Sequence, residues 1–383
     1  MAKYWNEVKS REKASNVEKN FVEQIIPLPC DQRYNLDDMK RIVSIIKEYG
    51  KMYKNQEENT RVEKFKRNSS LEEFLSEINN DLWNTEGSLL KNKEPKYPLI
   101  FIMGPMRSGS TLMTQWLANL GEFAYPTNMM SRFYNAPIIG SKIQRLLTDE
   151  QYNYRNEILD FNSQIDFSSE NGKTKGALAP NEFWYFWRRF LPFQELDYLP
   201  TKELFEKVDI TTLKAEFAGI VDVFQKPFAL KGMILNYNID FLDKVFEKAI
   251  FIHTKRDPLT NIESALKARE KQLGSIEEWY SFKIPEYEEL KKLNPYEQVA
   301  GQIYYINKAV ESGLENVAEH KKMIIKYEEF CENPKDFYEE LVSKLKVQGC
   351  QINTEYKGEK GFDVTRKSVI DKNILKAYSE FYK

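Results

Sequence analysis

The sequence has few of the residues that build disulfides and metal sites. Its 383 residues include three cysteines, Cys30, Cys331 and Cys350, which lie far apart and form no C-x-x-C pair. This spacing supports neither a disulfide framework nor a structural zinc site, so reduced thiols are expected. The two histidines, His253 and His320, cannot supply a three-histidine metal site, and they are the only imidazoles available for acid-base chemistry.

Net charge and long apolar runs are also lacking. The 56 Lys and Arg residues are balanced by 58 Asp and Glu, which gives a formal net charge of -2. Such a chain does not coat nucleic acid or an anionic membrane through bulk charge, so any anion must be held by a local cluster. No stretch reaches the roughly 18 apolar residues of a membrane span. The polar start of the chain lacks the apolar core of a secretory signal, and we expect a cytoplasmic protein.

Residues 1–95 have the pattern of a helical extension. Apolar residues at helical spacing predict one helix over residues 36–53. A capping box at residues 70–73 predicts a second helix, which runs to Leu82. The expected apolar stripe of this second helix consists of Leu71, Phe74, Leu75 and Ile78. Two prolines and several lysines between Lys91 and Pro98 predict a linker.

After this linker, short apolar runs alternate with helical patterns. The run at residues 99–103 fits a strand that is buried on both faces of a parallel sheet, and similar runs occur at 228–230, 249–252 and 323–325. Strands that alternate with helices predict an α/β domain, which we place at residues 96–350, before a C-terminal basic loop and helix at 351–383. Ligands of such a sheet bind beyond the carboxyl ends of its strands.

The loop after the first strand has the composition of an anion-binding loop. It reads GPMRSGST over residues 104–111, and a helix is predicted over residues 112–120 with Gly121 as its cap. Strand, glycine loop and helix direct backbone N–H groups and a helix dipole at an anion. The loop is similar to the nucleotide loop G-x-x-x-x-G-K-[ST], but Ser110 replaces the lysine and the cation is Arg107. This substitution weakens an ATPase interpretation. The alternative is an ordinary glycine turn.

A second candidate anion site follows the third predicted strand. Asp257 and Pro258 fit the N-cap and first position of a helix that runs to Glu270. Arg256 lies at the positive end of this helix, and Ser264 lies two turns further on a similar face. An arginine fork and a hydroxyl at a helix start suit a phosphate. Two anion sites on neighbouring strand ends would fit a nucleotide with phosphates at its 5' and 3' positions.

These elements resemble the sulfotransferases that use 3'-phosphoadenosine 5'-phosphosulfate (PAPS). The matching stretches are GPMRSGST at 104–111, FIHTKRDPLTNIES at 251–264 and KYEEFCENPKDFYEEL at 326–341. The resemblance covers residues 98–345 and implies a three-layer fold like that of P-loop NTPases, with a central parallel sheet flanked by helices. It also implies PAPS as cosubstrate, adenosine 3',5'-bisphosphate as product and no required metal. The implied nucleotide contacts are Arg107, Ser108, Gly109, Ser110, Thr111, Arg256, Ser264 and Tyr327, with Arg366 and Lys367 in a C-terminal basic loop.

The resemblance also indicates where the catalytic groups should lie. Cytosolic relatives carry a Lys-Thr-His tripeptide before the arginine element, and here Lys231 is retained while Met233 replaces the histidine. Lys231 is expected to stabilise the leaving oxygen of the phosphosulfate. The base must then come from elsewhere, and bacterial relatives often carry a Pro-x-Glu element that corresponds to Glu182. We expect partial burial among aromatic residues to raise the pKa of Glu182. The alternative for Glu182 is an acid that stabilises a helix start.

Aromatic residues after Glu182 are candidates for an acceptor pocket. Trp184, Tyr185 and Trp187 could present flat faces to a sugar or another ring system, although such a stripe is also typical of a core. His253 is expected to fill a core position, and His320 is expected to be solvated.

The leading hypothesis is a PAPS-dependent sulfotransferase that acts on a hydroxyl or amine of a carbohydrate, lipid or small metabolite. A P-loop kinase for a small acceptor and a relative that binds a nucleotide or glycan without turnover are the alternatives. The missing histidine favours the last of these. The acceptor, the oligomeric state and the role of residues 1–95 stay open.

Overall fold

The computed structural model describes residues 61–155, 157–158, 161, 165–170, 173–364 and 371–382. Val62–Lys383 forms one compact unit. The helix predicted over residues 36–53 lies outside the described part of the chain. Within that part, no helix is both long and apolar enough to cross a bilayer.

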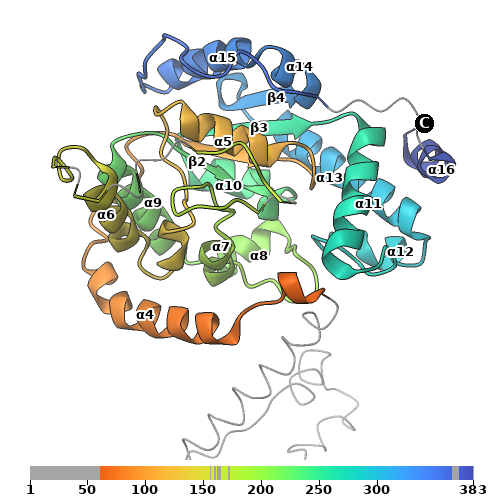
Figure 1. The fold of residues 1–383 in the computed structure, drawn as a ribbon, viewed down its shortest axis with the longest axis horizontal. Coiled ribbons are helices and arrows are strands. Elements are labelled where there is room, and N and C mark those ends of the chain that lie inside the picture. Colours follow the sequence, from red (N-terminus) through yellow and green to blue (C-terminus); the bar gives the residue numbers. More distant parts are fainter. Residues whose placement is uncertain are drawn as a thin grey trace, which may run out of the picture. The chain divides into compact units, whose positions relative to one another are not determined.

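Four parallel strands form the centre of the unit (Figure 1). They are β1 (Leu99–Met103), β2 (Phe228–Lys231), β3 (Ala249–Lys255) and β4 (Lys322–Lys326). Their order across the sheet is β2-β1-β3-β4. Ile102 pairs with Lys231 on one side of β1, and Met103 pairs with His253 on the other. The loops after β1, β2 and β3 therefore leave the sheet at the same edge, and the predicted parallel α/β fold is confirmed.

Helices cover both faces of the sheet. Along β1, Leu99, Phe101 and Met103 belong to the core of one face, whereas Ile100 and Ile102 belong to the core of the other. This alternation explains why a strand buried on both faces is encoded by a continuous apolar run. Residues of α7, α9, α10, α11 and α13 fill the first core, and residues of α5, α14 and α15 fill the second. The helices of the described residues are α4 (Ser69–Gly87), α5 (Ser110–Asn119), α6 (Pro137–Thr148), α7 (Trp184–Phe190), α8 (Thr201–Lys207), α9 (Ile210–Phe224), α10 (Ile239–Val245), α11 (Pro258–Leu273), α12 (Tyr287–Leu290), α13 (Pro295–Glu315), α14 (Tyr327–Glu332), α15 (Pro334–Val347) and α16 (Lys372–Phe381).

Helix α4 differs from its prediction in its cap and in its buried face. Asn68 caps the helix by accepting a hydrogen bond from the backbone N–H of Leu71, so the predicted box at residues 70–73 is not the cap. Leu71 and Phe74 of the predicted stripe are exposed, and Leu75 is buried.

Polar contacts determine which face of α4 is buried. Asn79 donates to the carbonyl of Arg132, and the carboxylate of Glu86 accepts the N–H groups of Ile138 and Ile139 at the start of α6. A hydrophobic pattern cannot reveal such anchors, because it does not show which partner a buried amide or carboxylate will find.

The two helices that follow the anion-binding loops agree better with their predictions. Helix α11 begins at Pro258, and its cap Asp257 accepts the N–H of Thr260 as expected. Helix α5 begins at Ser110, two residues before its predicted start, because Gly109 takes the left-handed conformation with φ 98° and the helix follows at once.

A buried ion pair fixes α7 to α9. Arg189 on α7 lies 2.5 Å from the carboxylate of Glu216 on α9, and Glu216 is fully buried. The guanidinium also donates to the carbonyl of Tyr134 and lies over the ring of Phe190. Because Glu182 directly precedes α7, this pair holds the segment that carries the expected base.

We predict that Arg189→Met lowers the free energy of unfolding by about 3 kcal/mol, because it leaves a buried carboxylate without its cation. Arg188→Met is the matched control, since the Arg188 side chain is mostly exposed and lies 3.8 Å from Asp197. Denaturant titration of both variants measures the difference. Equal stability of the two variants would contradict a structural role for the Arg189–Glu216 pair.

Candidate active site

The loop between β1 and α5 is shaped by contacts that leave little free space. A Cβ atom on Gly109 would lie 2.2 Å from the ring of Tyr327, the first residue of α14. Gly109 therefore allows the loop and this tyrosine to meet at the strand ends. The first N–H groups of α5 have no partner within their own helix, so they can bind an anion there.

The hydroxyls of this loop have different partners. Ser108 is fully buried and its hydroxyl lies 2.7 Å from that of Thr254 on β3, so this side chain fixes the loop and presents no hydroxyl to a ligand. The hydroxyl of Ser110, at the position of the missing lysine, lies 3.4 Å from the sulfur of Met233. Thr111 accepts a hydrogen bond from the ammonium of Lys231, at 2.9 Å.

Lys231 and Glu182 form an ion pair at the end of β2. The ammonium of Lys231 lies 2.7 Å from Oε1 of Glu182, and the indole of Trp184 donates to the other carboxylate oxygen. The side chain of Lys231 is 6% exposed, and that of Glu182 is 35% exposed. The sequence thus predicted two groups that the fold brings together from positions 49 residues apart.

The predicted direction of the pKa shift of Glu182 is wrong. Burial does push this pKa upward, but the charge of Lys231 and the hydrogen bonds from Lys231 and Trp184 together hold the pKa of Glu182 below its ordinary value. The sequence indicated the aromatic surroundings and could not show that a cation lies against the carboxylate. The carboxylate of Glu182 is therefore deprotonated at neutral pH.

The three aromatic residues after Glu182 lie in different environments. Trp184 is partly buried, and its ring packs against that of Phe282. Tyr185 donates to Glu72 of α4 and stacks on Tyr134. Trp187 is 1% exposed and belongs to the core beneath the sheet. It presents no surface to an acceptor, so the acceptor-pocket interpretation of Trp187 is corrected to a core role.

Two arginines meet beside the loop. The Nε atom of Arg107 donates to the hydroxyl of Ser264 on α11, at 3.2 Å, and Arg256 donates to the backbone carbonyl of Arg107, at 3.1 Å. Arg256 also lies over the ring of Tyr327, with 4.7 Å between its Cζ atom and the ring centroid. The two segments that the sequence predicts as anion sites are thus in contact with each other.

The charge of this arginine pair is not neutralised within the described residues. Neither Arg107 nor Arg256 has a carboxylate at ion-pair distance there, and Nε of Arg256 is buried without a hydrogen-bond partner. Burial lowers the pKa of Arg107, and the positive charge of Arg256 adds to this effect. Arg107 also has a φ of 64°, a left-handed conformation that is costly for a residue with a side chain. Two neighbouring guanidinium groups without a carboxylate partner among the described residues make this place a candidate anion site.

The two histidines take no part in the contacts described above. His253 on β3 is fully buried, and its Nε2 atom lies 2.9 Å from the side-chain oxygen of Asn307 on α13. Burial lowers the pKa of His253 to about 4, so the ring is neutral at physiological pH. His320, expected to be solvated, is half-buried in the turn before β4.

Two predicted residues cannot be placed, and two asparagines that the sequence analysis did not select contact the loop. Arg366 and Lys367 lie outside the described residues. Asn261, which the sequence analysis did not select, donates to the carbonyl of Met106, and Asn236 holds Gly104 by two hydrogen bonds. Asn261 stands within the arginine element and could have been suspected there. Asn236 has no sequence signal, because its partner is 132 residues away.

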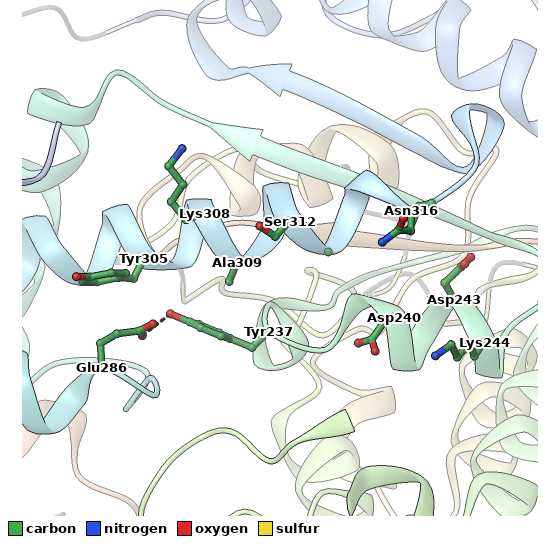
Figure 2. Close-up of a pocket in the computed structure, with 12 residues that line it drawn as sticks. Tyr237, Asp240, Asp243, Lys244, Glu286, Tyr305, Lys308, Ala309, Ser312 and Asn316 are labelled. Atoms are coloured by element: carbon green, nitrogen blue, oxygen red, sulfur yellow. Dashed lines mark hydrogen bonds between the residues drawn. The ribbon is translucent and has the colours of Figure 1, made fainter. Parts of the chain in front are cut away.

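A separate hollow of about 680 Å³ lies between α10 and α13 (Figure 2). Tyr237 and Glu286 lie at one end of it and are joined by a 2.7 Å hydrogen bond. None of the predicted site residues lines this hollow. In the described part of the chain, no three His, Cys, Asp or Glu side chains gather as a metal site would require.

A protein-family model and several solved structures match this chain. Residues 98–349 match the model of the sulfotransferase family. Among solved structures, sulfotransferase STF9 from Mycobacterium avium is 18% identical, with a TM-score of 0.41 and coverage of 70% of each chain. Sulfotransferase STF1 from Mycobacterium tuberculosis H37Rv is 11% identical, with a TM-score of 0.44 and coverage of 79% of this chain and 75% of that chain.

The sulfotransferase domain of the Synechococcus PCC 7002 olefin synthase is 16% identical, with a TM-score of 0.34 and coverage of 76% of this chain and 97% of that domain. A search of curated proteins gives no match. The family match includes both predicted anion-binding loops, the Lys231 strand end and Glu182, and it spans well over half of the sequence. This chain belongs to the sulfotransferase family.

Proposed function

We propose that this protein transfers the sulfuryl group of PAPS to a hydroxyl or amine of an acceptor. The observation that carries the proposal is the pair of arginines, Arg107 and Arg256, which lack carboxylate partners among the described residues beside a glycine loop. The buried Nε of Arg256 requires an acceptor, and a phosphate oxygen is a suitable one. The guanidinium of Arg256 with the hydroxyl of Ser264 fits the 3'-phosphate, and Arg107 belongs to the loop that would hold the 5' end.

The 5' end of the nucleotide would be held on the other side of the loop. Thr111 and the first N–H groups of α5 face this position, and Lys231 lies 2.9 Å from the Thr111 hydroxyl. The ammonium of Lys231 can stabilise negative charge on an oxygen that leaves sulfur. PAPS, when bound, supplies an activated sulfuryl group, and its transfer breaks the bond between sulfur and the oxygen of the 5'-phosphate.

Glu182 would accept the proton of the acceptor. Its carboxylate lies against Lys231, so the base and the cation that stabilises the leaving oxygen are within 2.7 Å of each other. An acceptor hydroxyl placed at Glu182 loses its proton to the carboxylate as its oxygen bonds to sulfur. The acceptor class could be a carbohydrate, a lipid or a small metabolite, and the partly exposed Trp184 donates a hydrogen bond to the carboxylate of the proposed base.

The proposed function first predicts which nucleotide the protein binds. Isothermal titration should show tight binding of adenosine 3',5'-bisphosphate and weak binding of ATP with magnesium. Arg256→Ala should weaken bisphosphate binding about 10-fold or more, because it removes charged hydrogen bonds to phosphate. Arg188→Ala, which removes an exposed arginine of α7, is the control and should leave the affinity unchanged.

Stronger binding of ATP with magnesium would favour a P-loop kinase instead. Unchanged bisphosphate affinity in Arg256→Ala would remove this residue from the nucleotide site. We also expect sulfuryl transfer to persist in excess EDTA, whereas a kinase would stop.

The second prediction concerns the base. Glu182→Gln should lower turnover by roughly 100-fold or more, the scale of a lost general base, while bisphosphate binding changes little. Glutamine keeps the size of the side chain and can still accept a hydrogen bond from Lys231. Glu288→Gln, on the surface of α12, is the control for a glutamate replaced away from the strand ends. Near-normal turnover of Glu182→Gln would exclude Glu182 as the base.

The third prediction concerns pH. Because Lys231 holds the pKa of Glu182 below its ordinary value of 4.5, the carboxylate should persist as pH falls to that value. Lys231→Met removes the attraction and leaves the burial, so the pKa of Glu182 should rise. A carbon-13 NMR titration of glutamate carboxyl groups, with the Glu182 signal identified by its loss in Glu182→Gln, measures both values. A pKa that stays or falls in Lys231→Met would contradict the assigned cause.

A further inference from the structure

One buried asparagine side chain holds the residue at which the anion-binding loop begins. Oδ1 of Asn236 accepts the backbone N–H of Gly104 at 2.9 Å, and Nδ2 of Asn236 donates to the carbonyl of Gly104 at 2.9 Å. Asn236 is 3% exposed. Both polar groups of one loop residue are thus satisfied by a single amide from a distant part of the chain.

The strand geometry explains why a side chain is needed there. β1 pairs with β2 as far as Lys231, and the N–H of Gly232 still donates to the carbonyl of Ile102, at 2.9 Å. The chain then turns into a short 3-10 helix, Met233–Leu235, and no longer runs beside β1. The N–H and carbonyl of Gly104 would be left buried without a strand neighbour, which is costly. The amide of Asn236 has one acceptor and one donor group, and it replaces that neighbour.

The other side of Gly104 is also closely packed. Gly104 has a φ of 129°, and a Cβ atom there would lie 2.6 Å from the carbonyl oxygen of Thr254 on β3. The loop therefore begins in a narrow space between Asn236 and β3. A few residues later the hydroxyl of Ser108 is bonded to that of Thr254. The position of the loop relative to β3 is fixed at two points, and Asn236 fixes the first residue of the loop beside the β2 end.

The segment that carries Asn236 is itself anchored. The next residue, Tyr237, lines the hollow between α10 and α13, where its hydroxyl donates to Glu286 (Figure 2). Asn236 also follows Lys231 by only five residues. A shift of the loop against this segment would therefore change the distance between Lys231 and the residues at the start of α5.

We infer that Asn236 is a positioning residue, which fixes the anion-binding loop against the β2 end so that the 5' group of the nucleotide meets Lys231. The inference rests on the proposed function. Asn236 does not face the ligand and acts through the backbone of Gly104. A loop that is already ordered loses less conformational freedom on binding, so the effect should appear in the affinity for the 5' group.

Two ligands separate this role from a general effect on folding. Adenosine 3',5'-bisphosphate occupies both halves of the proposed nucleotide site, whereas adenosine 3'-monophosphate lacks the 5' group. The dissociation constant of the 3'-monophosphate divided by that of the bisphosphate measures how much the 5' group adds to binding. In Asn236→Ala we expect this ratio to fall by about 10-fold, because the unpaired loop must be ordered on binding. Binding of the 3'-monophosphate should change little.

Asn236→Asp tests the same contact with almost no change in volume. Aspartate can still accept the N–H of Gly104, but its second oxygen faces the carbonyl oxygen of Gly104 and cannot donate. Asn236→Asp should therefore lower the ratio as much as Asn236→Ala does. The aspartate variant serves as the test if the alanine variant does not fold. Asn238→Ala is the matched control. Asn238 is 1% exposed and donates to the carbonyl of Leu199, so its loss should lower the melting temperature and leave the ratio unchanged.

The outcomes distinguish this inference from the proposed function. Wild-type protein that does not prefer the bisphosphate to the 3'-monophosphate would contradict the proposed function. A wild-type preference that both Asn236 variants retain would overturn the positioning role alone. Equal weakening of both ligands in the Asn236 variants would also overturn it, since that result indicates a general structural role.

Discussion

The site depends on the ammonium group of Lys231, which lies at the end of β2 and joins two other segments. It donates to Thr111 at the start of α5 and to Glu182 just before α7. A buried ammonium is costly unless a carboxylate or hydroxyl compensates the lost hydration, so these two partners are required by Lys231 itself. The same contact places a carboxylate beside the loop and lowers its pKa. One desolvated charge thus explains both the position and the protonation state of the proposed base.

The arginine pair shows the opposite arrangement. Arg107 and Arg256 lie close together, and within the described residues neither has a carboxylate at ion-pair distance. Such repulsion is tolerated because backbone contacts fix the groups: Arg256 donates to the Arg107 carbonyl, and Asn261 donates to the preceding one. The left-handed conformation of Arg107 is part of the same strain. The chain as a whole is nearly neutral, so this positive charge is a local property of the strand ends.

Much of the fold could be predicted from the sequence, whereas the site could be predicted only in part. Continuous apolar runs identified the four strands, and Asp257 with Pro258 identified the start of α11. The glycine loop and the arginine element were also recognisable, because each carries glycine, cationic or capping residues at a characteristic spacing. The buried face of α4 was not, since Asn79 and Glu86 replace part of the expected apolar stripe. Trp187 and Trp184 look equivalent in sequence, yet the first lies in the core and the second beside Glu182.

The sequence by itself determined the four strands in their order along the chain, the two loops at the strand ends with the helices that follow them, and the types of charge that these loops carry. These features are encoded in short segments, where hydrophobic period, glycine and capping residues act locally. Only the tertiary structure decided which charges meet. The lowered pKa of Glu182 requires Lys231, which lies 49 residues away in the sequence. The hydrogen bonds between Asn236 and Gly104 join residues that are 132 positions apart. Electrostatic and hydrogen-bond energies depend on distance in space, and a linear pattern does not contain that distance.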